Sequence, residues 1–238
     1  MTFIRKQSWL IICCILFAHK SYNQNSDPQN LYSWFDNTTG NETLSLNNGP
    51  VHYNTFRTAD RNNFRYLKNE FLKGNVIYDD QKFYDVALKY DLFTDALLYQ
   101  PEGTSYAINL IKEKVTSFSL DGKQFKNLTF KDSPDFTDGY YEESVATDQF
   151  VFYTKHVKKV FKVAKEKITL SEFRPEDSYL LHYQNKYTKI ASQKNVVSVF
   201  PEQKAKINNF YSMNKNLSKS DTHQFMKNLF VYINQIIK

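Results

Sequence analysis

A succession of short β-favouring runs separated by turn residues occupies residues 74–130, and it constrains the fold more than any other part of the sequence. Side chains of the run 115–120 alternate between two sides, the period of two that is typical of half-buried strands. The Asp121-Gly122 step that follows is a strong hairpin signal, because both residues tolerate the positive φ that a two-residue turn requires. The stretch therefore predicts an antiparallel meander.

The same signals place the individual strands and turns. The meander is expected to have strands at 76–78, 82–90, 96–99, 106–111, 114–120 and 124–130, with turns at 79–80, 94–95, 101–103 and 121–122. Further strands are predicted outside it, at 51–56, 140–145, 150–163, 179–183 and 187–191. A break is expected at 171–177, where the sequence reads SEFRPED.

The run 150–163 and the residues after it are rich in lysine, and two interpretations stay open. Lysines on an exposed edge strand block edge-to-edge aggregation. A row of lysines is also a surface for an anionic partner. The lysines concerned are Lys155, Lys158, Lys159, Lys162, Lys165 and Lys167.

After residue 191 the periodicity changes from that of strands to that of helices. Helices are predicted at 193–200, 202–214 and 221–236, with Ser192 and Ser220 as the N-caps of the first and the last. One face of the last helix is apolar, since it carries Phe225, Met226, Leu229, Phe230, Tyr232, Ile233, Ile236 and Ile237. We expect this helix to cover the open side of the sheet, and the alternative is an arm for a partner protein.

These elements define the fold class as α+β. We expect a mostly antiparallel meander sheet, strongly curved or closed into a partial barrel, with two to three C-terminal helices packed on it. A single domain is predicted over residues 48–238, β-rich over 48–191 and helical over 192–238. Only 6 glycines and 6 prolines are present, which argues against linkers within it.

The N-terminus has the features of a secretory signal. Arg5 and Lys6 precede an apolar run from Trp9 to Ala18, which is too short to span a bilayer. We predict a signal peptide over 1–23 and a flexible leader over 24–47. No lipoprotein is expected, because the residues before Cys13 lack the small side chain that lipidation requires.

Removal of the signal changes the chemistry of the chain. Both cysteines leave with it, so the mature chain has no disulfide, thiol nucleophile or cysteine metal ligand. Three of the 31 basic residues leave as well, so 28 remain against 25 acidic ones and the formal charge falls from +6 to +3. A nearly balanced charge of this size does not predict nucleic-acid binding.

No catalytic, cofactor-binding or metal-binding residue is predicted. The histidines of the mature chain, His52, His156, His182 and His223, are far apart in the sequence and form no HxxxH or HExxH motif. No P-loop, GxGxxG or GxSxG motif is present either. Most aspartates of the meander fall at predicted turns, where their side chains bond to the backbone.

Five stretches carry a resemblance. They are Phe71–Tyr78, Gln81–Leu92, Lys114–Phe118, Gly139–Glu142 and Lys194–Phe200. In these stretches the chain resembles a group of small secreted proteins of unknown function from Bacteroidetes-type bacteria. The resemblance implies export in a Gram-negative cell envelope, and it implies no activity.

We therefore expect an exported, non-enzymatic binding or interaction module of the periplasm or cell surface. Its partner would be an envelope protein, a glycan or a lipid, with no transmembrane helix in the mature chain. One alternative is a hydrolase using carboxylates around Asp85, Asp91 and Glu142. Others are a lipid-binding protein that holds its ligand in the curved sheet, and a structural accessory of an outer-membrane complex. Two carboxylates that meet in a cleft would favour the hydrolase, and a deep apolar cavity would favour the lipid-binding protein.

Export yields the first testable prediction. The protein isolated from the native envelope fraction should begin near Gln24, because the signal is cleaved during translocation. Mass spectrometry of the intact protein measures this start directly. A protein that still carries Met1 in that fraction would contradict the prediction.

Overall fold

A computed structural model of the protein describes residues 45–58, 63–131, 135–165 and 168–237. The predicted signal and nearly all of the predicted leader lie outside these residues. The described part begins with a 3-10 helix, η2 (Ser45–Asn48), whose Leu46 is fully buried. The core of the domain therefore includes residues slightly before the boundary expected at residue 48.

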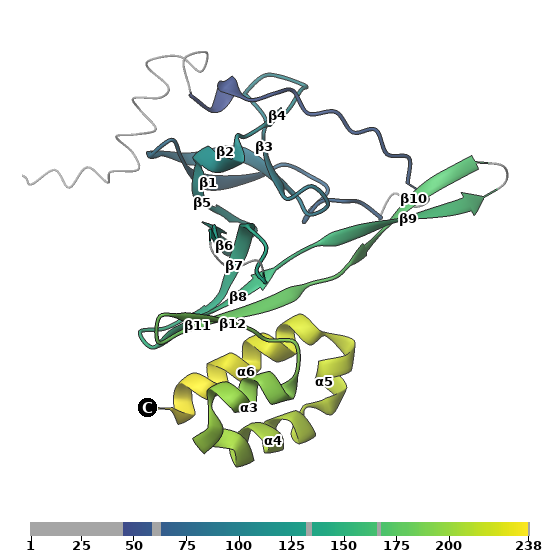
Figure 1. Ribbon diagram of the computed structural model, residues 1–238. Helices are drawn as coiled ribbons and strands as arrows, with labels where there is room; N and C mark the ends of the chain where they lie inside the picture. Colours follow the sequence, from purple (N-terminus) through teal and green to yellow (C-terminus); the bar gives the residue numbers. More distant parts are fainter. Residues whose placement is uncertain (1–44, 59–62, 132–134, 166–167, 238) are drawn as a thin grey trace, which may run out of the picture.

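Among the described residues, ten strands form one sheet and two more form a separate two-stranded ribbon (Figure 1). The sheet contains β1 (Leu72–Tyr78), β2 (Gln81–Asp91), β3 (Ala96–Tyr99), β4 (Ile108–Asn109), β5 (Val115–Leu120), β6 (Lys123–Leu128), β7 (Gly139–Ala146), β8 (Phe150–Lys155), β11 (Ser178–Tyr183) and β12 (Lys186–Lys189). A short 3-10 helix, η3 (Lys112–Lys114), precedes β5. The ribbon consists of β9 (Lys158–Lys165) and β10 (Ile168–Pro175).

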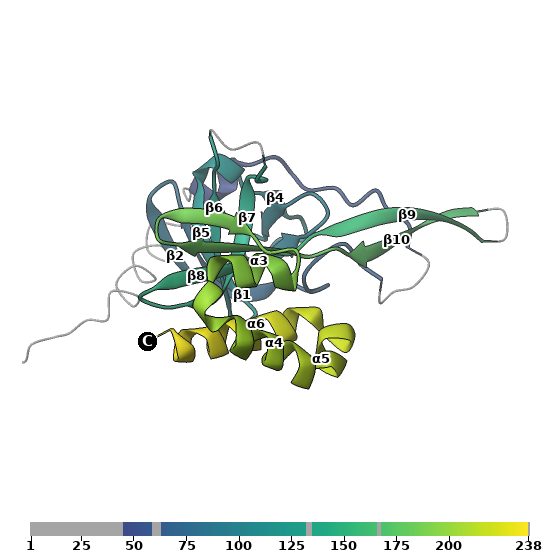
Figure 2. The same cartoon turned by 60° about the horizontal axis from the view of Figure 1, so that its bottom comes forward.

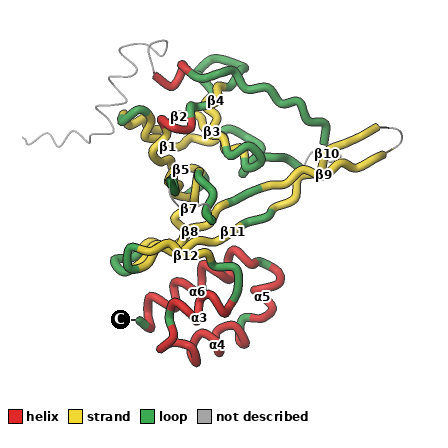
Figure 3. The backbone as a smooth tube through the Cα atoms, viewed as in Figure 1, coloured by secondary structure: helices red, strands yellow, loops and turns green. Residues whose placement is uncertain are grey.

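The sheet is antiparallel throughout, with the order β12-β11-β8-β7-β6-β5-β1-β2-β3-β4. Two meanders, β1 to β4 and β5 to β8, join where β1 pairs with β5. The hairpin of β11 and β12 extends the sheet beyond β8. The predicted α+β class and the strongly curved sheet are confirmed (Figure 3). The two meanders lie side by side because β5 returns to β1 instead of continuing beyond β4.

The hairpin turns explain why the short runs pair in this register. Asp79 and Asp80, which link β1 to β2, both have positive φ, at 52° and 62°. Asp121 and Gly122 do the same between β5 and β6, at 53° and 71°. Positive φ at both central residues is the requirement of the type I′ turn, whose twist matches that of the flanking strands. The Asp-rich breaks in the sequence are therefore turns of the sheet.

Contacts between distant strands show how strongly the sheet curls. Strands β2 and β8 are separated by four others in the sheet order. The backbone N–H of Lys158, just past β8, nevertheless donates to the carbonyl of Leu92, just past β2, at 3.1 Å. Beside it, Asp95 Oδ2 accepts from Lys155 Nζ at 2.9 Å and from Lys112 Nζ at 2.6 Å. One corner of the sheet thus folds over onto the other.

This corner requires a glycine. A Cβ atom at Gly139 would lie 1.8 Å from Asp95 Oδ2 and 2.6 Å from Lys155 Nζ, and the φ of Gly139 is +133°. Burial alone would raise the pKa of Asp95, but the ammonium groups of Lys155 and Lys112 outweigh it and lower that pKa. The carboxylate form is therefore the one that holds the corner closed.

The concave face of the sheet is a packed aromatic core. The ring of Tyr90 makes edge contacts with Phe118, Phe125 and Tyr140, with centroids 5.4 to 5.7 Å apart. The Tyr90 hydroxyl donates to Asp95 Oδ1 at 2.6 Å, so the ring layer is tied to the closed corner. Side chains thus fill the centre of the space that the curled sheet encloses.

The C-terminal helices form a second layer that packs on one end of the sheet, below β8, β11 and β12 in Figure 1 (Figure 2 shows it turned forward). They are α3 (Gln193–Val199), the 3-10 helix η4 (Pro201–Gln203), α4 (Lys204–Met213), α5 (Lys215–Ser220) and α6 (Thr222–Ile236). The expected packing of the last helix on the sheet is confirmed, since α6 buries Phe225, Met226, Leu229, Phe230 and Ile233. In the described residues, no helix has the length and apolarity needed to cross a membrane.

Several predicted element boundaries are wrong. Ser192 caps α3 as expected, but Ser220 ends α5, and the side chain of Asp221 caps α6 by accepting from Gln224 N at 2.9 Å. The predicted strand 51–56 is reduced to an isolated bridge between Val51 and Ile108. The predicted strand 106–111 contains only the two residues of β4.

The largest error concerns the ribbon. The predicted strand 150–163 is two strands, because the chain leaves the sheet after β8 and β9 pairs with β10 instead. The break expected at 171–177 is wrong for the same reason, since residues up to Pro175 belong to β10. Polar residues and a proline are acceptable there, because this ribbon lies outside the ten-stranded sheet.

A substitution tests how much the helix layer depends on one contact. Phe230 stacks on Phe152 of β8 with ring centroids 3.9 Å apart and is fully buried. Phe230→Ala should lower the free energy of unfolding by about 3–5 kcal/mol, as large-to-small changes of buried aromatic residues do. Chemical denaturation measures it, with Val231→Ala as the control because Val231 is 44% exposed. Equal effects of the two changes would show that the helix layer is not part of the core.

Candidate functional site

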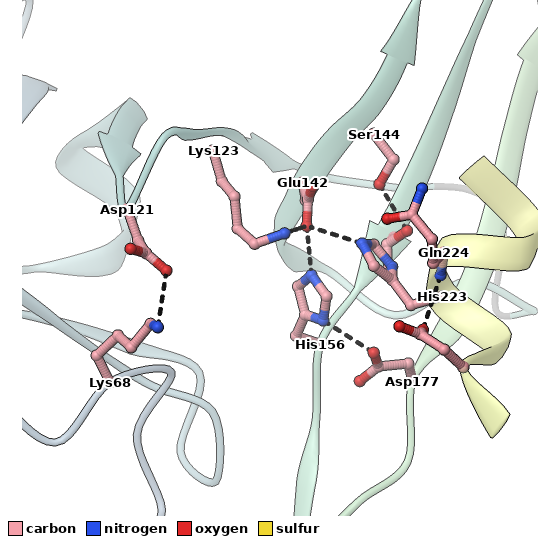
Figure 4. Close-up of polar contacts among 11 residues, drawn as sticks. Lys68, Asp121, Lys123, Glu142, Ser144, His156, Asp177, His223 and Gln224 are labelled. Atoms are coloured by element: carbon pink, nitrogen blue, oxygen red, sulfur yellow. Dashed lines mark hydrogen bonds and ion pairs between the residues drawn. The ribbon is translucent and has the colours of Figure 1, made fainter. Parts of the chain in front are cut away.

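Five polar side chains from separate parts of the chain meet beside the first turn of α6 (Figure 4), and we call them the Glu142 cluster. They are Lys123 in β6, Glu142 in β7, His156 directly after β8, Asp177 between β10 and β11, and His223 in α6. The cluster lies between the concave core of the sheet and the helix layer. On the core side, the ring centroid of Phe125 lies 6.3 Å from that of His156, and on the other side His223 belongs to α6 of the helix layer.

The carboxylate of Glu142 is the centre of the cluster. Its Oε2 atom accepts hydrogen bonds from His156 Nε2 at 2.5 Å and from Lys123 Nζ at 2.7 Å. The other ring nitrogen of His156, Nδ1, donates to Asp177 Oδ2 at 2.9 Å. The imidazole therefore bridges two carboxylates, and both of its nitrogens act as donors when it is protonated.

Burial and hydrogen bonding act in opposite directions on these groups. Burial alone would raise the pKa of Glu142, but the bonds from His156 and Lys123 outweigh it and lower that pKa to about 2. Burial alone would lower the pKa of His156, but its bonds to Asp177 and Glu142 outweigh it and raise that pKa. The fold thus favours the carboxylate form of Glu142 and the imidazolium form of His156.

His223 completes the cluster from the helix side. Its Nε2 lies 3.8 Å from Glu142 Oε2, and its ring centroid lies 5.2 Å from that of His156. Burial lowers the pKa of His223, which favours the neutral ring. Its Nδ1 atom is buried, and no hydrogen bond to it is found among the described residues. A buried nitrogen of this kind calls for a partner such as a water molecule or an ion.

One oxygen of Glu142 and one nitrogen each of His156 and His223 lie within 4.8 Å of one another. Within the described part of the chain, this is the group of carboxylate, imidazole and thiol side chains that has the spacing to hold a metal ion. The sequence motifs did not predict it, because its members are separated by 14 and 67 residues and come from a strand, a loop and a helix. One signal was present: Glu142 follows Tyr140 on the inward side of a buried strand.

The other two histidines of the described residues lie elsewhere. His52 bonds to Asn109 Oδ1 at 3.0 Å and to the hydroxyl of Tyr66 at 3.1 Å. His182 of β11 stacks on Tyr187 with ring centroids 4.4 Å apart. Neither belongs to the Glu142 cluster.

The carboxylates considered for a hydrolase are not brought together. Glu142 lies in its cluster, and Asp85 is exposed at an irregular position of β2, with a φ of 53°. Asp91 is fully buried and forms an ion pair with Arg65. Its second oxygen accepts from the backbone N–H groups of Phe93 and Thr94 at 3.0 and 3.3 Å, the bonding of a structural turn.

The β9–β10 ribbon is the second candidate region, because it projects away from both the sheet and the helices (Figure 1). The register pairs Val163 with Leu170, and the alternation of strands puts Phe161 and Ile168 on the same face as that pair. Phe161 is 43% exposed and Ile168 is 51% exposed. The apolar residues of this side, Phe161, Val163, Ile168 and Leu170, are named the ribbon face below. Glu172 lies opposite Phe161 on the same side, and the guanidinium of Arg174 lies 4.6 Å from the centroid of the Phe161 ring.

The opposite face anchors the ribbon at its base. Phe173 is buried against Phe56 and Phe93, with ring centroids 5.3 and 5.6 Å away. Asn63 acts as a one-residue partner strand, since its side chain accepts from the N–H of Phe173 at 2.6 Å and donates to its carbonyl at 3.1 Å. Farther along β10, the N–H of Ser171 donates to the carbonyl of Arg57 at 2.7 Å, and Thr58 forms an isolated parallel bridge with Ser171. The described residues place no full third strand beside the ribbon.

The lysines of this region do not form one solvated row. Lys155 is buried against Asp95, and Lys158 donates to the carbonyls of Phe64 and Tyr66 at 2.7 and 3.1 Å. Lys159 pairs with Glu176 at the surface. The sequence run is therefore divided between the closed corner of the sheet, the base of the ribbon and its surface.

Comparisons of this chain with protein-family models, curated proteins and solved structures found no match. The Glu142 cluster and the ribbon are therefore the features from which a function can be inferred.

The structural role of Asp91 is open to a direct test. Asp91→Asn removes the charge that compensates the buried Arg65, and breaking a buried ion pair in this way costs about 3–5 kcal/mol. Denaturant unfolding should show that loss. Asp85→Asn is the matched control, because an exposed site should change the free energy of unfolding by less than about 0.5 kcal/mol. An unchanged stability of Asp91→Asn would instead reopen a catalytic role for this carboxylate.

Proposed function

We propose that the protein is an exported, non-enzymatic binding module of a Gram-negative cell envelope, and that the β9–β10 ribbon binds a partner protein there. The observation that carries this proposal is the ribbon face, an apolar row on an element that projects from the domain. Phe161 and Ile168 on it are among the most exposed large apolar side chains of the described residues.

The energetics of a two-stranded ribbon support a partner. An isolated hairpin is marginally stable in water, and three or more strands are needed for independent stability. Here the ribbon is anchored through Phe173 and through the bond from Ser171 N to Arg57 O, whereas the described residues add no strand beside the pairs from Val163–Leu170 to Lys165–Ile168. An added strand from another protein would pair with the edge of β9, which no described strand covers, and it would bury the apolar side chains of the ribbon face.

Export is supported by the N-terminal sequence and by the resemblance to small secreted proteins. Arg5 and Lys6 before the apolar run are the charge pattern of a secretory signal. The mature chain also needs no disulfide, because its aromatic core and buried ion pairs hold the domain together.

Two of the three alternatives, the hydrolase and the lipid-binding protein, receive less support. A carboxylate hydrolase needs two carboxylates facing a common cleft, but Asp91 is committed to Arg65 and Asp85 is exposed on β2. A lipid-binding sheet needs a cavity, but the rings around Tyr90 fill the centre of the concave face.

Site-specific crosslinking tests the proposed function, because the mature chain offers no competing cysteine. Phe161→Cys and Ile168→Cys, carrying a photocrosslinker, should each form the same discrete protein adduct in the native envelope. Asp148→Cys, in the exposed turn between β7 and β8, should not form it and is the matched control. Phe161→Ser combined with Ile168→Ser should abolish co-purification of the crosslinked protein without unfolding the domain.

Three results would overturn the proposal. One is the absence of any adduct from the ribbon positions, and a second is an equal set of adducts from Asp148→Cys. The third is an adduct with lipid alone together with flotation on liposomes, because the ribbon would then be a membrane contact.

A further inference from the structure

We propose that Glu142, His156 and His223 form a binding site for one divalent metal ion of the zinc class. The proposal is independent of the ribbon and of the function inferred for it. It rests on three donor atoms from β7, the end of β8 and α6 that all lie within 4.8 Å of one another.

The donor set matches the chemistry of zinc. Two imidazoles and one carboxylate are a common zinc ligand set, with the remaining position taken by water. Imidazole donors favour zinc, cobalt and nickel over magnesium and calcium, which prefer oxygen ligands alone. Two ligand atoms about 2 Å from a tetrahedral ion are about 3.3 Å apart, so the 3.8 Å between His223 Nε2 and Glu142 Oε2 leaves room for the ion. His156 Nε2, which is hydrogen-bonded to Oε2 at 2.5 Å, has to move away from that oxygen when the ion replaces its proton.

Asp177 is placed as the outer partner of a metal-binding histidine. It accepts from His156 Nδ1 at 2.9 Å, which directs the other nitrogen, Nε2, toward Glu142. Ligating histidines in proteins almost always donate their second N–H to a carboxylate, a carbonyl or water in this way. Asp177 thus orients the ring whether a proton or a metal ion occupies Nε2.

A metal ion would replace the two positively charged groups that now bond to the Glu142 carboxylate, the protonated ring of His156 and the ammonium of Lys123. The proton on His156 Nε2 passes to solvent as the nitrogen lone pair binds the metal, and the Nδ1–H bond to Asp177 is kept. The ammonium of Lys123, whose side chain is 26% exposed, moves from Oε2 toward water. Lys123 therefore competes with the metal ion for Glu142. Its removal should tighten metal binding, whereas removal of a ligand should weaken it.

Titration of the metal-free mature chain with Zn²⁺ and with Co²⁺ tests the site. One equivalent should bind, and cobalt should give the visible absorption of a low-coordinate site. His223→Gln should weaken binding at least tenfold, and Asp177→Asn by about 10–100-fold as outer-partner changes do. Lys123→Met should tighten it. His182→Gln, a histidine change outside the cluster, should leave it unchanged.

Thermal unfolding provides a second readout that also controls for folding. Zinc should raise the melting temperature of the wild type and of His182→Gln, but not that of His223→Gln. The proposal is overturned if the wild type binds no zinc at micromolar concentration. It is also overturned if His223→Gln and His182→Gln bind zinc equally, because the ion would then sit elsewhere.

Discussion

The buried carboxylate of Glu142 is the charge that the sheet and the helix layer have to accommodate between them. It lies between the aromatic core of the curled sheet and the apolar layer under α6, where an unpaired charge would cost several kcal/mol. His156 and Lys123 compensate that charge, and Asp177 compensates His156 in turn. Removing one member therefore leaves another buried and unpaired, so these residues act together and not as separate surface pairs.

A second buried set performs the same task at the other side of the curl. Asp95 joins Lys155 at the end of β8 to the β2–β3 turn, and the N–H of Lys158 adds a backbone bond to Leu92. Two adjacent residues therefore belong to the two buried sets. Lys155 pairs with Asp95 in one set, and His156 pairs with Glu142 in the other. The chain can leave the sheet at this point because its polar groups are satisfied on both sides.

Features encoded by neighbouring residues were predictable from the sequence, and features that depend on distant pairing were not. Asp121-Gly122 predicted a turn because φ is positive at both residues, and Ser192 predicted a cap because its side chain reaches Asn195 N. Strand β10 was missed because Ser171, Glu172 and Pro175 indicate a break in the chain, and only the pairing with β9 makes this segment a strand. The Glu142 cluster was missed because the curl of the sheet brings its members together across unrelated elements.

The ribbon and the Glu142 cluster are connected through the chain itself. His156 lies two residues before β9, and Asp177 lies two residues after β10, so their 2.9 Å hydrogen bond closes the base of the ribbon. The bond from Glu176 N to Val157 O, at 2.8 Å, lies beside it and continues the pairing toward the cluster. The bond from His156 Nε2 to Glu142 ties this base to β7 of the sheet. The direction of the ribbon is thus held by the same imidazole that compensates the charge of Glu142 under α6.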